Sequence, residues 1–166
     1  TTIIYPIRKK TTMAKLTVNS YDEFAAHKGE IIGESDWLTV GQDMINKFAD
    51  ATLDHQWIHT DPKRAAVESP YKSNIAHGYL QLSLLPYLWQ QLIQVNNISM
   101  MVNYGMDKMR FGTPVLSGKR VKLVASLEDI ANLRGICRAQ IKFRLMVEGE
   151  KKFALEGLAT FLYYFK

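Results

Sequence analysis

The sequence predicts an α+β fold in which one long antiparallel sheet packs against a buried helix. Helical patterns fill most of the first hundred residues and alternating strands fill the rest, so the two kinds of element are separated along the chain. The segment 78–95 has apolar residues on most sides of a helix, which favours burial. With 166 residues, 47% of them hydrophobic, the chain has the size and composition of one domain with a sizeable core.

We expect residues 1–14 to be an extension or a disordered N-terminus, because the segment that starts at Met13 looks like a natural start. Residues 15–166 then form the single domain. A short helix at 21–27 comes first, followed by a turn at 29–33 and an extended segment at 37–40.

The next helix is amphipathic, since its apolar face recurs at i, i+3, i+4, i+7 and i+8. The residues of that face are Ile45, Phe48, Ala49, Thr52 and Leu53. Thr39 and Gln42 have the spacing of a capping box, which places the start of the helix near Val40.

Two further helices are marked by proline. Asp61 followed by Pro62 is a capping residue with proline at the first helical position, and this helix should stop before Pro70. The buried helix at 78–95 contains Pro86, which should kink it.

After residue 99 the pattern changes to strands at 100–111, 120–127, 138–147 and 153–165. In two of them apolar and polar residues alternate, which is typical of a sheet with one buried and one wet face. The apolar members are Val121, Leu123, Ala125 and Leu127 in one strand and Ala139, Ile141, Phe143, Leu145 and Val147 in the other. Residues 148–151 supply a hairpin turn into the last strand.

Asp54 and His59 are the first candidates for chemistry. On one continuous helix they would lie about 140° apart around the axis and could not converge. The periodic face stops at Leu53, however, and a new helix is capped at Asp61, so we expect a loop at 54–60. Catalytic groups are often placed on such loops. The alternative is that Asp54 merely ends a helix and His59 is a polar surface residue.

A second candidate group opens the buried helix at His77 and Gly78. An N–H at a helix N-terminus favours an anion, and the enolate-like oxygen of a thioester is such an anion. Gly78 is equally explained as a packing glycine, and His77 as a structural hydrogen-bonding residue.

Other chemistries are less well supported. His55 and His59 are four apart, but this piece is expected to be loop, and we predict no metal site. Cys137 lies in an alternating strand, which predicts a buried, inert thiol.

The net charge is +5, but the basic residues are dispersed and are not interleaved with aromatic residues, so no nucleic-acid partner is expected. No apolar run is long enough for a membrane span, and one cysteine without a secretory signal favours the cytoplasm.

Three motifs in register, over about residues 33–165, resemble the MaoC-like dehydratases. They are Asp54-x-x-x-x-His59-x-Asp61-Pro62, then Ile75-Ala76-His77-Gly78-Tyr79-Leu80-x-x-Ser83-Leu84, then Asn103-Tyr104-Gly105-x-x-Lys108-x-Arg110-Phe111-x-x-Pro114-Val115-x-x-Gly118. The sequence Gln56-Trp57-Ile58-His59 is similar to that of the NodN-type branch of the family. At Gln56 and Trp57 the sequence departs from the usual Asn-Pro of the hydratases.

The resemblance implies a hot-dog fold, in which a curved antiparallel sheet wraps around one long helix. It implies (R)-specific hydration of trans-2-enoyl-CoA or an acyl-carrier thioester by Asp54 and His59. The amide of Gly78 would take the oxyanion position, and His77 and Ser83 would lie near the substrate. It also implies a homodimer, and no cofactor beyond the coenzyme A of the substrate. A hot-dog thioesterase and a non-catalytic acyl-CoA-binding protein are the alternatives. Chain length, carrier and physiological direction stay open.

Overall fold

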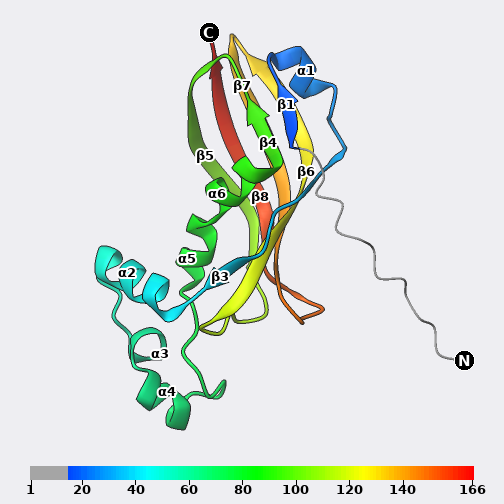
Figure 1. Cartoon of the computed structure of the whole chain (residues 1–166). Coiled ribbons are helices and arrows are strands. Elements are labelled where there is room, and N and C mark those ends of the chain that lie inside the picture. The colour runs from blue at the N-terminus through cyan, green and yellow to red at the C-terminus, as the bar shows by residue number, and fades with distance from the viewer. Residues whose placement is uncertain (1–14) are drawn as a thin grey trace, which may run out of the picture.

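The computed structural model describes residues 15–166 of the chain, so the extension predicted at 1–14 lies outside the described residues (Figure 1). A curved antiparallel sheet with the order β2-β6-β7-β8-β5 is its main element, and β3 pairs with β6 beside β2. The strands are β2 Ile31–Glu34, β3 Leu38–Val40, β5 Ile98–Phe111, β6 Lys119–Leu133, β7 Ile136–Val147 and β8 Phe153–Phe165.

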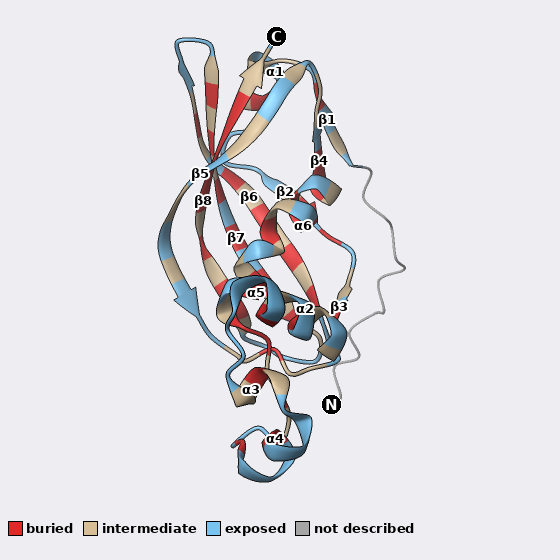
Figure 2. Cartoon of the chain, turned by 90° about the vertical axis from the view of Figure 1, so that its left-hand side faces the viewer, coloured by how far each residue is buried: buried red, intermediate tan, exposed pale blue. Residues whose placement is uncertain are grey.

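Helices α5 and α6 run along the hollow side of the sheet, and α2, α3 and α4 extend beyond one end of it (Figures 1 and 2). This is the predicted α+β arrangement of a sheet around a central helix. The helices are α1 Tyr21–Ala25, α2 Gln42–Thr52, α3 Trp57–Thr60, α4 Pro62–Glu68, α5 Gly78–Ser83 and α6 Leu85–Leu92.

The core lies between the central helix and the sheet, and the buried residues of Figure 2 follow these elements. The two alternating strands bury the faces that their sequences predict: Val121, Leu123 and Leu127 are 0% exposed and Ala125 is 2% exposed. The predicted apolar face of β7 is likewise buried. On α6 the indole Nε1 of Trp89 donates to the hydroxyl of Tyr163 on β8, at 2.7 Å, which ties the central helix to the sheet.

Several boundaries differ from the sequence prediction. The turn expected at 29–33 is in part the strand β2, which pairs with β6. The capping box of Thr39 and Gln42 is wrong, because α2 begins at Gln42 and its N-cap is Gly41, without a side-chain cap. Gln42 instead uses its side-chain amide to reach α3.

The central helix is also shorter than expected. It breaks at Leu84, and Pro86 falls in the first turn of α6, where a missing N–H is tolerated, so proline starts a helix here instead of kinking one. Residues 93–95 are not helical; they form β4 (Ile93–Val95), which pairs in parallel with β1 (Leu16–Val18).

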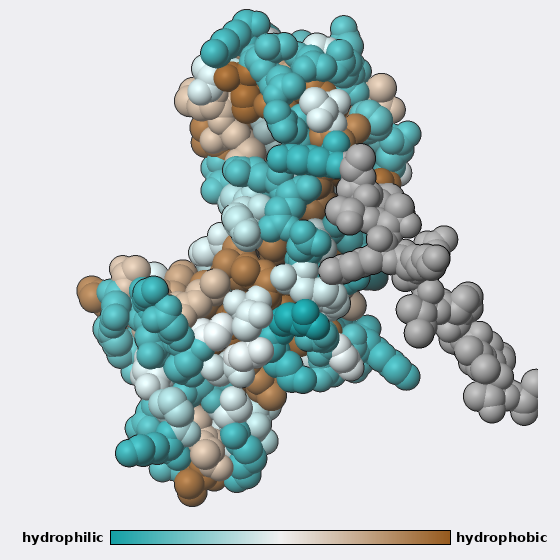
Figure 3. All heavy atoms as spheres, in the orientation of Figure 1, coloured by the Kyte–Doolittle hydropathy of each residue, from teal (hydrophilic) through white to brown (hydrophobic). Residues whose placement is uncertain are grey.

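Among residues 15–166, no helix is long and apolar enough to cross a membrane. Apolar side chains nevertheless reach the surface in the middle of the face shown in Figure 3, near α5.

Candidate active site

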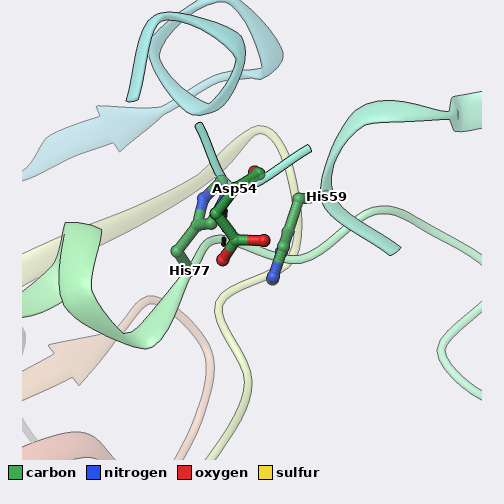
Figure 4. Close-up of side chains that lie close together, drawn as sticks. All are labelled: Asp54, His59 and His77. Carbon is green, nitrogen blue, oxygen red and sulfur yellow. Dashed lines mark hydrogen bonds and ion pairs between the residues drawn. The ribbon is translucent and has the colours of Figure 1, made fainter. Parts of the chain in front are cut away.

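Three polar side chains meet at the end of the molecule where α2 and α3 adjoin the start of α5. Asp54 follows α2, His59 lies in α3 and His77 immediately precedes α5 (Figure 4). One ligand atom from each of the three lies within 4.8 Å of the others. The structure therefore brings together Asp54 and His59, and adds His77 to the same cluster.

The end of α2 places Asp54. Leu53 has a left-handed backbone with φ of 63°, which stops the helix and turns the chain. Residues 54–56 are loop, but 57–60 form α3, so the prediction of a loop over the whole of 54–60 is wrong at its second half. The side chain of Asp54 is 54% exposed and its carboxylate is open to solvent.

His59 is held more tightly. It is 9% exposed, and its Nδ1 lies 2.7 Å from the carbonyl oxygen of Ile75. Because a carbonyl only accepts hydrogen bonds, Nδ1 carries the proton and Nε2 keeps its lone pair. The amide of Ile75 in turn donates to the carbonyl of Ile58, at 3.1 Å, which fixes the two segments to each other.

Burial lowers the pKa of His59 below its usual value of 6.5. The hydrogen bond to Ile75 opposes this effect, the neighbouring His77 adds to it, and the charge of Asp54 opposes it. His59 is thus a neutral base near pH 7, beside an exposed carboxylate. An imidazole lone pair and a carboxylate at this separation can accept both hydrogens of one water, since each hydrogen bond spans about 2.8 Å.

Two residues that sequence reasoning missed brace the helix that carries His59. The side-chain amide of Gln42 donates to the carbonyl of His59, at 2.7 Å. Asn74 is 2% exposed, and its amide donates to the carbonyls of Trp57 and Ile58. A single polar residue at a helix start, such as Gln42, or in a loop, such as Asn74, gives no periodic signal, so only the fold shows that these amides hold α3.

Gly78 begins α5 beneath an aromatic ring. A Cβ at this position would lie 2.8 Å from Cε1 of Phe111, so glycine lets the ring of Phe111 lie directly against the start of the helix. Its N–H belongs to the first helical turn, whose N–H groups have no intrahelical acceptor. Ser83 is exposed, and its hydroxyl donates to the carbonyl of Tyr79 at 2.7 Å. Its predicted contact with substrate stays a prediction.

The acid and the two histidines offer donor types that also bind metals, and one ligand atom of each lies within 4.8 Å of the others. The rings of His59 and His77 stack with centroids 3.8 Å apart and planes inclined by 24°. One nitrogen of each ring also lies at hydrogen-bond distance from a backbone carbonyl. The cluster is suited to proton transfer.

The family model described as "MaoC like domain" matches residues 23–147. The chain belongs to this family. The resemblance drawn from the three motifs is thereby confirmed.

Curated relatives of this MaoC-like domain match most of its length. This chain is 45% identical over 139 residues to 3-hydroxyacyl-thioester dehydratase Z of Mycobacterium tuberculosis, and the match covers 82% of this chain and 90% of that protein. It is 50% identical over 125 residues to nodulation protein N of Rhizobium leguminosarum bv. viciae, covering 75% of this chain and 77% of the relative. The similarity to the NodN-type branch is also confirmed.

Solved structures support the fold. The unliganded (R)-hydratase PhaJ1 of Pseudomonas aeruginosa superposes with a TM-score of 0.71 at 21% identity, covering 88% of this chain and 86% of that one. An Archaeoglobus structure described as a monoamine oxidase regulatory protein gives a TM-score of 0.75 at 22% identity, covering 90% and 97%. The hot-dog fold is confirmed.

The two residues of this MaoC-like domain that replace the usual Asn-Pro of the hydratases lie at the start of α3. Gln56 is the N-cap of α3 and Trp57 is its first residue, a position that proline also suits. The guanidinium of Arg64 lies 4.5 Å from the ring centroid of Trp57 and packs α4 against α3. Both pairs of residues are therefore compatible with the same turn beneath His59.

Proposed function

We propose that this protein catalyses the reversible addition of water to a trans-2-enoyl thioester, which gives a (3R)-3-hydroxyacyl thioester. The observation that carries the proposal is the pairing of the exposed Asp54 carboxylate with the buried, neutral His59 in one cluster. The named activity of the mycobacterial relative, a 3-hydroxyacyl-thioester dehydratase, is the reverse of this reaction.

In this proposal one water lies between the carboxylate of Asp54 and Nε2 of His59. Nε2 takes a proton as the water oxygen bonds to C3 of the substrate, and the electron pair of the double bond moves toward the thioester carbonyl. The imidazolium then returns a proton to C2 on the same face, so that water is added and no atom is oxidised or reduced. The bond from Nδ1 of His59 to Ile75 keeps Nε2 directed to the water.

The thioester oxygen gains negative charge during this step, and a donor aimed at it lowers the barrier. We assign this part to the N–H of Gly78, because it lies at the start of α5 next to the residue that completes the cluster. The chemistry needs no redox group or Lewis acid, so the proposal includes no cofactor beyond the carrier of the acyl group. That carrier is coenzyme A or an acyl-carrier protein.

The proposal includes a homodimer formed at β5. Within the described residues this strand pairs only with β8, so its other edge is open over fourteen residues. Large apolar side chains on it are exposed: Tyr104 by 68%, Phe111 by 55% and Met100 by 50%. Since Phe111 covers Gly78, a second copy joined to this edge would lie beside the site.

A cytoplasmic location is also proposed, supported by the single buried cysteine, Cys137.

The test is turnover by Asp54→Asn and His59→Gln with trans-2-enoyl-CoA substrates of several chain lengths. Each change keeps the approximate size of its side chain but removes a proton acceptor. We expect kcat to fall at least a hundredfold in each variant, with unchanged Tm. Near-wild-type hydration in either variant would refute the role of that residue. Release of free thiol by the wild type without hydration would indicate a thioesterase instead.

A further inference from the structure

His77 contacts both residues of the proposed pair. It is 2% exposed, and its Nε2 lies 3.0 Å from the backbone carbonyl oxygen of Asp54. Its ring stacks on the ring of His59, and the ring of Phe48 on α2 also contacts it, with centroids 5.0 Å apart and planes inclined by 56°. Figure 4 shows His77 on one side of Asp54 and His59 on the other.

We propose that His77 is a positioning residue, which holds the backbone of Asp54 through its Nε2–H and supports the ring of His59 by stacking. This inference rests on the proposed function, since it concerns the geometry of the same pair. This role replaces the expectation that His77 binds substrate. Its side chain is 2% exposed and lies against the rings of His59 and Phe48.

The hydrogen bonds determine the tautomer of each ring. The carbonyl of Asp54 only accepts, so His77 carries its proton on Nε2, and its Nδ1 is left as a buried acceptor without a partner among the described residues. His59 has the opposite tautomer, with its proton on Nδ1. Buried polar atoms are rarely left without a partner, and the exceptions call for an explanation.

The loop that carries Asp54 needs this support. The preceding Leu53 is 81% exposed, so the loop has little apolar packing of its own at that point. Nε2 of His77 lies 3.0 Å from the backbone carbonyl oxygen of Asp54 and 3.9 Å from a carboxylate oxygen, so its shorter contact is with the backbone. The bond therefore fixes the backbone, while the carboxylate stays half exposed and accepts only a long hydrogen bond, of 3.5 Å, from the amide of Gln56.

His77 also acts on the titration of His59. The titratable groups that shift the pKa of His59 are His77 and Asp54. From α2, Gln42 bonds to the carbonyl of His59 and Phe48 contacts the ring of His77, and neither side chain titrates. His77 lowers the pKa of His59. Removal of the His77 imidazole should therefore raise the pKa of His59 toward its usual value.

Two substitutions separate the donor from the ring. His77→Gln keeps an N–H near the position of Nε2 but removes the stacked ring, and His77→Phe keeps a ring but removes the donor. We expect kcat/KM to fall about ten- to a hundredfold in His77→Phe, as misplacement of a reacting group by about 1 Å does. His77→Gln should recover part of this loss. In both variants the acid limb of the pH profile should move to higher pH, which a general loss of stability would not cause.

His27→Phe is the matched control, because His27 follows α1 near the opposite end of the molecule and bonds to Glu30. It should keep the activity and the pH profile of the wild type. A His77→Phe variant that is folded, with wild-type kcat/KM and an unchanged acid limb, would overturn the inference.

A spectroscopic measurement on the wild type decides the question without any variant or activity. Nitrogen-15 correlation spectra of the histidine rings should show His77 with its proton on Nε2 and His59 with its proton on Nδ1. The opposite tautomer at His77 would overturn the inference. If the wild type turned over no acyl thioester, the proposed function would fail, but these spectra and the titration of His59 in His77→Gln would still test the positioning role.

Discussion

At the scale of single residues, the site joins one exposed and one buried titratable group. Asp54 is open to solvent and keeps its hydration, whereas His59 is enclosed and its pKa is lowered chiefly by burial. The pair thus offers a hydrated carboxylate and a neutral imidazole at neutral pH. A hydratase needs this combination because the base has to be unprotonated when water binds.

The first prediction concerns pH. Because the pKa of His59 lies below 6.5 in the folded protein, we expect the acid limb of kcat/KM to fall below pH 6.5. The titration of His59 should also change the free energy of unfolding. As pH drops from 6.5 through the lowered pKa, the unfolded chain binds a proton that the folded chain does not, so the free energy of unfolding decreases. Urea denaturation and rate measurements over pH 4.5–8 test both effects.

His59→Gln is the comparison for this prediction. The part of the pH-dependent loss of stability that belongs to His59 should be absent from the variant. An acid limb above pH 6.5 in the wild type would contradict the assignment, as would identical stability curves for the two proteins.

At the scale of the elements, long patterned segments were predictable from sequence and short ones were not. β7 buries every second residue and β6 does so from Val121 to Leu127, so period two is visible in the sequence. The strands β1 and β4 have three residues each, and α3 is a single turn, which is too short for any period to appear. Their conformations depend on distant partners.

The same limit applies to the site. Spacing alone could not show that Asp54 and His59 converge, and the motifs that indicated it did so by resemblance. His77 lies next to Asp54 only because the chain between 54 and 77 folds back through α3 and α4. The braces from Gln42 and Asn74 are likewise contacts between segments, so no local pattern reports them.

The second prediction tests the cap of α4, which was predicted from Asp61 and Pro62 and is confirmed. The carboxylate of Asp61 accepts from the amide of Arg64 at 3.0 Å. Asp61→Ala should therefore lower the free energy of unfolding by about 1 kcal/mol. Asp43→Ala, which removes an exposed carboxylate from the first turn of α2 without removing a cap, should cost less. Urea titration measures both, and equal losses would count against the cap.

At the scale of the whole molecule, the sheet has two different edges. On one side β2 is short, and its partner β6 is also covered by β3. On the other side β5 presents a long row of backbone groups, with exposed aromatic and methionine side chains. An edge of this kind invites pairing with another strand.

The third prediction follows from that edge. The double substitution Met100→Lys with Tyr104→Lys should raise the dissociation constant of the proposed homodimer at least tenfold, because a charge on an edge opposes strand pairing. Ile31→Lys is the control, since Ile31 is 74% exposed but lies on β2 at the other edge. Light scattering over a dilution series gives both constants. A wild type that is monomeric at every concentration would contradict the dimer.

The order of the strands along the chain also constrains how the molecule folds during synthesis. β1 pairs with β4, and β2 and β3 both pair with β6, so each early strand waits for a partner made much later. Only β6, β7 and β8 follow one another as neighbours in the sheet. Pairings between residues distant in sequence close slowly because the loop entropy is lost before the contacts form. We therefore expect the first hundred residues to leave the ribosome without a stable sheet, and to depend on the last three strands for their fold.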